Sequence, residues 1–183
     1  NPVALPGVLA PVTRIGGGEV RIDAAIASMT AAWDGQDLAG SLSFGYHPVS
    51  KRTTLVREVV LRNYDAAPRT YAITPTFRYA DDEASGAVAI DTPSSITVPG
   101  NASATFNVRL TMEPSALPVW TLDGGARGGD GFRLQGVEFD GYVVVDGGVD
   151  NTVHVAWQVL PHRAADVAAS PKAIKLASNG TAT

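Results

Sequence analysis

Residues 92–111, TPSSITVPGNASATFNVRLT, contain the pattern on which the interpretation of this chain depends. After the turn residues 99–101, apolar and polar side chains alternate one by one. A period of two residues predicts a β-strand with one buried and one wet face, so another layer must cover the apolar face. The predicted faces consist of Ala104, Phe106, Val108 and Leu110 on one side and Ser103, Thr105, Asn107, Arg109 and Thr111 on the other.

The same alternation recurs along the chain between residues 40 and 160. About seven or eight short strands separated by turn residues are typical of an all-β, antiparallel β-sandwich, and we predict that fold. Pro75 removes a ladder donor, so its strand is expected to lie at an edge or to bend there, and Pro161 is expected to stop the last strand. The predicted strands cover residues 41–46, 52–63, 70–79, 88–90, 96–98, 103–111, 137–145 and 153–159.

A short helix is predicted before the sandwich, over residues Asp23–Trp33. Ile22, Ile26, Met29 and Trp33 follow one another at spacings of four, three and four, which places them on one helix face. A fully apolar stripe must dock on something, either the sandwich or a domain outside this chain.

The other segments are predicted to connect and extend this domain. Residues 1–18 carry three prolines and four glycines and indicate a linker, so residues 1–39 are interpreted as linker plus helix and residues 40–161 as the sandwich. Residues 113–118 are expected to form one helical turn, and residues 123–131 a glycine-rich loop. Residues 162–183 are interpreted as a tail or the start of a further domain, with a possible strand at Ala173–Leu176.

Composition narrows the possible partners. The chain has 183 residues, a formal charge of −4 and no cysteine, which excludes disulfides and thiolate chemistry and argues against nucleic acid or an anionic membrane surface as a partner. No apolar run approaches the ~20 residues of a membrane span. The start, Asn1-Pro2-Val3, lacks an initiating methionine and a signal peptide, and predicts an excised fragment or a mature product.

The three histidines do not form a recognisable catalytic pattern. A Ser-His-Asp triad requires three residues that meet in space, and no Gly-x-Ser-x-Gly elbow is present. His154 alternates with apolar residues and is predicted to lie at the surface. His47 precedes Pro48 and His162 follows Pro161, which predicts exposed loop positions. We therefore predict no catalytic, cofactor-binding or metal-binding residue, and no cofactor.

Two polar segments contain residue types that occur in ligand sites. The glycine-rich stretch 124–131 matches neither phosphate-loop pattern and leads into a strand, so a connection is favoured. Asp81, Asp82 and Glu83 supply oxygen ligands of the kind that Ca²⁺ prefers, but their spacing matches no calcium loop, which favours a solvated turn. Four further aspartates precede glycines and are interpreted as turn residues, namely Asp123, Asp130, Asp140 and Asp146.

Exposed aromatic side chains would indicate a sugar-binding surface. Trp157 alternates with valines and is predicted to lie in the core, whereas Trp120 follows a proline-rich turn and is the candidate for an exposed platform. Packing over the end of the sandwich is the alternative for Trp120. Asn101 and Asn179 each begin an N-glycosylation sequon, a short pattern that arises often by chance.

Several sequence segments, taken together, resemble segments of secreted subtilisin-like serine peptidases. Residues 13–33, TRIGGGEVRIDAAIASMTAAW, resemble the segment that closes the catalytic domain of this family. Residues 40–46, 53–64 and 69–77 are similar to the fibronectin type III-like domain that follows it in large members. The same domain is also similar to residues 92–111, 139–145 and 155–167. Two positions differ from the family pattern, because Gly100-Asn101 replaces the usual Ala-Gly and Ala156 replaces the usual proline. The resemblance covers residues 13 to about 168.

This resemblance implies a non-catalytic accessory domain of an immunoglobulin-like fold. The family's Gly-Thr-Ser-Met-Ala nucleophile motif lies before the region matching Thr13, and neither it nor the aspartate and histidine motifs are present here. The implied partner is the catalytic domain of the same polypeptide, on which the sandwich packs and helps frame access of a protein substrate. The implied location is extracellular or on the bacterial cell surface. Two alternatives stay open: a sandwich that binds a glycan or cell-surface ligand, and a chain that hydrolyses something unaided.

Overall fold

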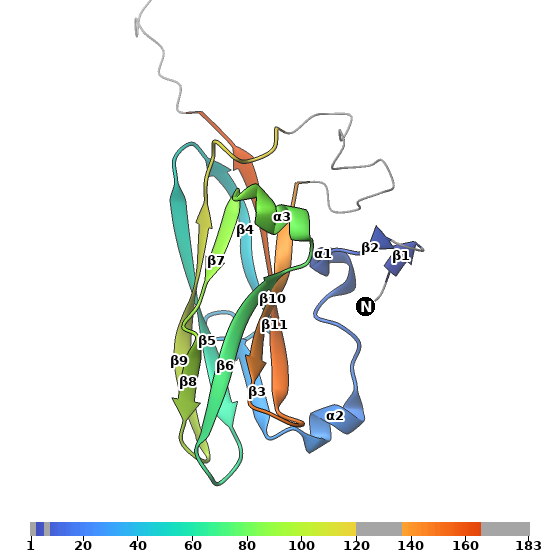
Figure 1. Ribbon diagram of the computed structural model, residues 1–183, viewed down its shortest axis with the longest axis vertical. Helices are drawn as coiled ribbons and strands as arrows, with labels where there is room; N and C mark the ends of the chain where they lie inside the picture. The colour runs from blue at the N-terminus through green and yellow to red at the C-terminus, as the bar shows by residue number, and fades with distance from the viewer. Residues whose placement is uncertain (1–2, 6–7, 120–136, 166–183) are drawn as a thin grey trace, which may run out of the picture.

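The computed structural model describes residues 3–5, 8–119 and 137–165 (Figure 1). Strands dominate, and the helices are short. In chain order the elements are β1 Val3–Leu5, β2 Val8–Leu9, α1 Val12–Ile15, α2 Ile22–Ala27, β3 Thr30–Asp34, β4 Ser41–Val49, β5 Thr53–Asn63, β6 Arg69–Phe77, α3 Ala80–Ser85, β7 Val88–Asp91, β8 Ser95–Val98, β9 Ala102–Met112, β10 Phe139–Asp146 and β11 Thr152–Arg163.

Two sheets pack face to face, which confirms the predicted β-sandwich. One sheet has five strands in the order β4-β11-β10-β6-β8, and the other has four in the order β3-β5-β9-β7. The pair β4–β11 is parallel, whereas the other pairs of the two sheets are antiparallel. Large side chains from both sheets fill the space between them, with Trp157, Tyr71, Phe139, Leu61 and Leu110 fully buried.

The stretch 92–111 contributes a strand to each sheet. β8 pairs with β6 in the five-stranded sheet, whereas β9 pairs with β5 and β7 in the four-stranded sheet. Phe106, Val108 and Leu110 face the core, while Asn107 and Arg109 are exposed, which confirms the predicted alternation. The turn at 99–101 therefore crosses from one layer to the other.

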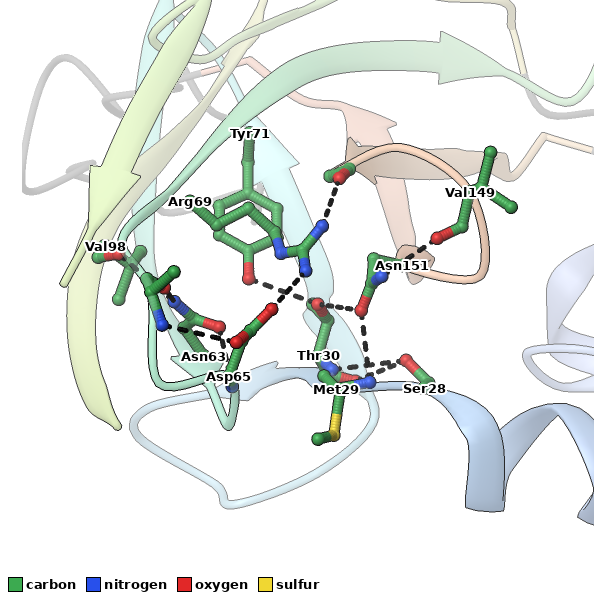
Figure 2. A network of polar contacts seen from close by, with 12 residues as sticks. Ser28, Met29, Thr30, Asn63, Asp65, Arg69, Tyr71, Val98, Val149 and Asn151 are labelled. Atoms are coloured by element: carbon green, nitrogen blue, oxygen red, sulfur yellow. Dashed lines mark hydrogen bonds and ion pairs between the residues drawn. The ribbon is translucent and has the colours of Figure 1, made fainter. Parts of the chain in front are cut away.

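A buried asparagine holds this crossing in place. The side-chain amide of Asn63 donates to the carbonyl oxygens of Ala67 at 2.9 Å, Val98 at 3.3 Å and Pro99 at 3.3 Å, and its Oδ1 accepts the backbone N–H of Asp65 at 3.0 Å. Asn63 is fully buried, so these contacts replace water that the backbone groups lose on folding (Figure 2).

The predicted helix over Asp23–Trp33 is wrong in its second half. α2 ends at Ala27, and Trp33 lies in β3, which pairs antiparallel with β5 from Val59 to Asn63. Pairing with an existing strand overrides the helical spacing, because the ladder satisfies the backbone groups of residues 30–34. The four-stranded sheet thus begins at Thr30, before the expected boundary at residue 40.

Proline and glycine account for two further differences on the five-stranded sheet. Pro161 does not stop β11, which continues beside β4 to Arg163. The pairing of β11 with β10 ends at Val159. Pro161 therefore has no β10 residue beside it that would require a backbone N–H donor. In β4 the expected alternation breaks at Gly45, whose φ of +74° accompanies a shift in register, and Tyr46 is therefore exposed rather than buried.

Pro75 lies where β6 is an edge, as predicted. The β6–β8 pairing covers Arg69–Ala72, and Pro75 lies beyond it, beside β10 only. The prediction of a solvated turn at residues 81–83 is wrong. These residues belong to α3, and Asp82 is fully buried.

Residues 1–18 contain β1, β2 and α1 rather than linker alone. Residues 113–117 form the expected turn. The glycine-rich loop 123–131, Trp120 and the possible strand Ala173–Leu176 lie outside the described residues.

Gly100 is expected to be indispensable for the crossing between the sheets. A Cβ at this position would lie 1.9 Å from the carbonyl oxygen of Ala66, so Gly100→Ala forces the backbone apart. We expect a loss of about 2–4 kcal/mol in the free energy of unfolding, measured by urea denaturation. Gly40→Ala is the matched control, since a Cβ there meets no described atom within 4 Å and should change stability by less than about 0.5 kcal/mol. Equal stability of the two variants would contradict this account.

Candidate functional site

The most distinctive polar contacts lie where the N-terminal segment crosses the outer face of the five-stranded sheet. We call residues 10–30 the entry segment. Arg78 Nε donates to the carbonyl oxygen of Ala10 at 2.9 Å, and the backbone N–H of Val12 donates to Oδ2 of Asp140. Ala10 and Val12 are both buried. The start of the entry segment is therefore packed and hydrogen-bonded to the sandwich.

Two further contacts continue this attachment along the sheet. Thr13 Oγ1 donates to Oε2 of Glu138 at 2.7 Å. Nε2 of His154 lies 2.7 Å from the carbonyl oxygen of Gly17, and because a carbonyl only accepts, Nε2 carries the hydrogen. In Figure 1 the chain after α1 runs beside β10 and β11 and leads to α2. We call these contacts, from residue 10 to residue 17, the first anchor.

Asp140 is the electrostatically unusual residue of the first anchor. Burial raises the pKa of its carboxyl group to about 6, against an ordinary value of 3.8, although the hydrogen bond from Val12 lowers the pKa. The carboxylates of Asp82 and Glu138 raise it further. Oδ1 of Asp140 and Oε1 of Gln158 are both buried, and neither has a hydrogen-bond partner among the described residues. These residues oppose each other across β10 and β11, so two acceptors share one small region.

A second anchor holds the other end of the entry segment, at the start of β3. Oδ1 of Asn151 accepts the backbone N–H of Met29 at 3.1 Å and Oγ1–H of Thr30 at 3.2 Å. Thr30 Oγ1 also lies 3.1 Å from the hydroxyl of Tyr71. Thr30, Tyr71 and Asn151 are buried, so the network is shielded from water (Figure 2). The chain enters the sandwich in a defined direction.

Between the two anchors the entry segment exposes apolar side chains. Val20, Ile22 and Ile26 are 86%, 69% and 79% exposed, and Met29 is 45% exposed. Within the described molecule, α2 has no buried residue. A helix of six residues has little stability of its own, and it is held here from both ends. We call Val20, Ile22, Ile26 and Met29 the open apolar face.

The predicted histidine positions are partly corrected. His154 is exposed on the outer face of β11, as expected. His47 and His162 are half-buried and lie in the paired strands β4 and β11, not in loops. His47 Nε2 lies 2.6 Å from the carbonyl oxygen of Phe44, and the ring of His162 lies 6.2 Å from that of Tyr46.

The tryptophan and carboxylate predictions have mixed outcomes. Trp157 is fully buried, with its Nε1 donating to the carbonyl oxygen of Thr76 at 3.1 Å, which confirms its place in the core. Trp120 lies outside the described residues. No group of three metal-ligating side chains occurs within residues 3–5, 8–119 and 137–165. In the same part of the chain, no helix is long and apolar enough to cross a membrane.

Sequence reasoning missed Asp140. It was interpreted as the first residue of an Asp-Gly turn, but it lies inside β10, where Gly141 permits close approach of the backbone of Thr76. Asp146, by contrast, is a turn residue as predicted and accepts the backbone N–H of Gly148 at 2.9 Å. A carboxylate at an outward position of an otherwise apolar strand was the available signal, since such a residue needs a polar partner if it becomes buried.

Comparisons with known proteins found distant structural similarity to several solved proteins. No protein-family model and no curated protein matches the chain. The FixG-related protein of Vibrio parahaemolyticus is 8% identical, with a TM-score of 0.42, over 72% of this chain and 94% of that chain. A PapD-like domain of human CEP192 is 12% identical, with a TM-score of 0.42, over 75% and 87%. The CooA pilin subunit of enterotoxigenic Escherichia coli is 13% identical, with a TM-score of 0.38, over 76% and 99%. These similarities carry no argument about function.

Asp140→Asn is expected to stabilise the protein at neutral pH. Because the folded-state pKa of about 6 lies above 3.8, the folded protein binds this proton more tightly than the unfolded chain does. The cost of the buried charge is therefore present above pH 6 and disappears as the pH falls toward 3.8. An asparagine can still accept from Val12 and offers a donor to Gln158. We expect a gain of about 1–3 kcal/mol at pH 8 that shrinks toward pH 4, measured by urea denaturation.

Asp91→Asn at the exposed end of β7 is the control, with changes within about 0.5 kcal/mol across the same pH range. A less stable Asp140→Asn protein at pH 8, or a difference that does not depend on pH, would contradict the role given to Asp140.

Proposed function

We propose that this chain is the accessory β-sandwich domain of an exported subtilisin-like serine endopeptidase, and that it packs on the catalytic domain of the same polypeptide. The sandwich makes no contribution to bond cleavage in this proposal. It holds the end of the catalytic domain in place and helps frame access of a protein substrate. Secretion to the cell surface or the medium is part of the same proposal.

The observation that carries the proposal is the open apolar face. Ile22 and Ile26 are exposed on a helix that two anchors keep in position, although burying such a side chain contributes about 1.5–3 kcal/mol. Residues 13–33, which include this helix, are the ones that resemble the closing segment of the catalytic domain. A catalytic domain seated on Ile22 and Ile26 would remove both from water.

The anchors explain why such an arrangement would be rigid. Asp140 and His154 hold the entry segment on one side of α2, and Asn151 holds it on the other. A domain that leads into the entry segment would therefore be oriented by backbone contacts rather than by a flexible linker. Substrate access depends on such an orientation.

The two alternative functions have less support. The glycan-binding alternative, in the form that the sequence raised it, placed the ligand on Trp120, which lies outside the described residues. The hydrolytic alternative requires a histidine beside a serine or a carboxylate in a pocket, whereas the hydrogen bonds of His47 and His154 run to backbone carbonyls.

Ile22→Ser with Ile26→Ser is expected to uncouple the two domains of the parent polypeptide. In the isolated chain both residues are exposed, so the stability of the sandwich should change by less than about 0.5 kcal/mol. In the polypeptide that includes the catalytic domain, the substitutions should remove about 3 kcal/mol or more of interface burial. Calorimetry should then resolve two unfolding transitions in place of one coupled transition.

Leu38→Ser is the matched control, because Leu38 is 78% exposed in the loop between β3 and β4, away from α2. Its polypeptide should keep the coupled transition. If the double variant behaves like this control, the open apolar face is not the docking surface.

The coding sequence upstream of Asn1 provides an independent check. The proposal predicts a Gly-Thr-Ser nucleophile motif in the same reading frame, within about a hundred residues upstream of Asn1. Sequencing the parent gene tests this directly. An upstream region without this motif would contradict the proposed family, while leaving the fold unaffected.

A further inference from the structure

A hollow lies between the entry segment and the outer face of the five-stranded sheet, beside the first anchor. Gly17, Glu19 and Arg21 form one wall, and Tyr142 of β10 and His154 of β11 form the other. Its volume of about 590 Å³ falls within the range of about 300–1,000 Å³ that is typical of small-molecule sites. The docking proposal above does not use this hollow.

Two rings on the sheet give the hollow an aromatic wall. The rings of Tyr142 and His154 lie 5.0 Å apart at 85°, so one presents its edge to the face of the other, and each restricts the other's movement. Tyr142 lies opposite Ala156 across β10 and β11, and Ala156 is fully buried. The backbone below is also held, because Thr76 Oγ1 donates to the carbonyl oxygen of Tyr142 at 3.1 Å.

The polar groups around the rings include both donors and acceptors. His154 donates through Nε2 to Gly17, which leaves Nδ1 of the neutral ring as an acceptor. Glu19 contributes a carboxylate and Arg21 a guanidinium group, and both side chains are exposed. The ion pair of Arg21 with Asp23 is long, at 3.9 Å, and both side chains are largely exposed to water, so the pair leaves the guanidinium group available to a ligand.

We infer that this hollow binds a neutral sugar unit of a glycan. A sugar ring offers C–H groups that pack on an aromatic face, and hydroxyl groups that both donate and accept hydrogen bonds. Tyr142 supplies the face, Glu19 and His154 supply acceptors, and Arg21 supplies donors. An anionic ligand fits poorly, because Glu19 offsets the charge of Arg21 in the wall and the chain carries a net charge of −4. The site differs from the platform at Trp120 that the sequence raised.

The test is binding of neutral hexasaccharides to the intact chain, followed by the NMR signals of the His154 imidazole. The probes are cellohexaose, chitohexaose and mannohexaose, with inorganic phosphate as the anionic comparison. We expect at least one hexasaccharide to shift the His154 signals saturably, with phosphate producing a smaller effect. Tyr142→Ala should weaken that binding by at least about tenfold, which corresponds to about 1.4 kcal/mol. Tyr142→Phe, which keeps the aromatic face, should retain it.

Tyr64→Ala is the matched control, since Tyr64 is 48% exposed beside Arg62, outside the hollow, and its loss should leave binding unchanged. If Tyr142→Ala does not fold, Glu19→Ala and Arg21→Ala replace it, because both side chains are exposed and their loss should also weaken binding. The inference is overturned if no hexasaccharide shifts His154, if phosphate binds more tightly, or if Tyr64→Ala has the same effect as the variants of the hollow. None of these outcomes bears on docking through Ile22 and Ile26.

Discussion

The structure depends on one crossing of the chain between its two sheets. β8 and β9 are separated by three residues, yet they belong to opposite layers, so the turn between them must satisfy its backbone groups away from any ladder. Asn63 at the end of β5 does this with one side chain, which donates to the carbonyls of Val98 and Pro99 at the start of the crossing and to that of Ala67 in the β5–β6 loop. Its Oδ1 accepts the backbone N–H of Asp65 in the same loop. Because Asn63 also ends the strand that pairs with β3 and β9, the crossing and the four-stranded sheet stabilise each other.

The same end of the sandwich also sets the direction in which the chain enters. Asn151 and Tyr71 come from the five-stranded sheet and its last turn, and they meet Thr30 at the start of the four-stranded sheet. At the other end of the entry segment, Asp140 remains buried although its ionisation is unfavourable there. The hydrogen bond from Val12 offsets part of the unfavourable burial of this carboxylate, and it fixes the position of residue 12 on the sheet.

Local patterns predicted the strands well and the polar contacts poorly. The period of two along residues 103–111 depends only on which side chains are apolar, and the burial of side chains along β9 follows the same period. The helical spacing of Ile22, Ile26, Met29 and Trp33 was misleading after Ala27, since spacing says nothing about an available strand such as β5. Asp140 was assigned to a turn because Asp-Gly pairs favour turns, although the surrounding apolar residues favoured a strand. Nothing in the sequence links Thr30 to Asn151, which are 121 residues apart.

By itself, therefore, the amino-acid sequence determined an all-β sandwich, the approximate bounds of most of its strands, the core positions of residues such as Trp157, and the start of a short helix near Ile22. These features follow from burial and hydrogen bonding within a few neighbouring residues. Only the tertiary structure decided that β8 and β9 belong to different sheets, that β4 and β11 run parallel, and that Asp140, His154 and Asn151 hold the entry segment. Those contacts join residues that are distant in sequence, and their partners are chosen by how the sheets pack rather than by any local preference of the chain.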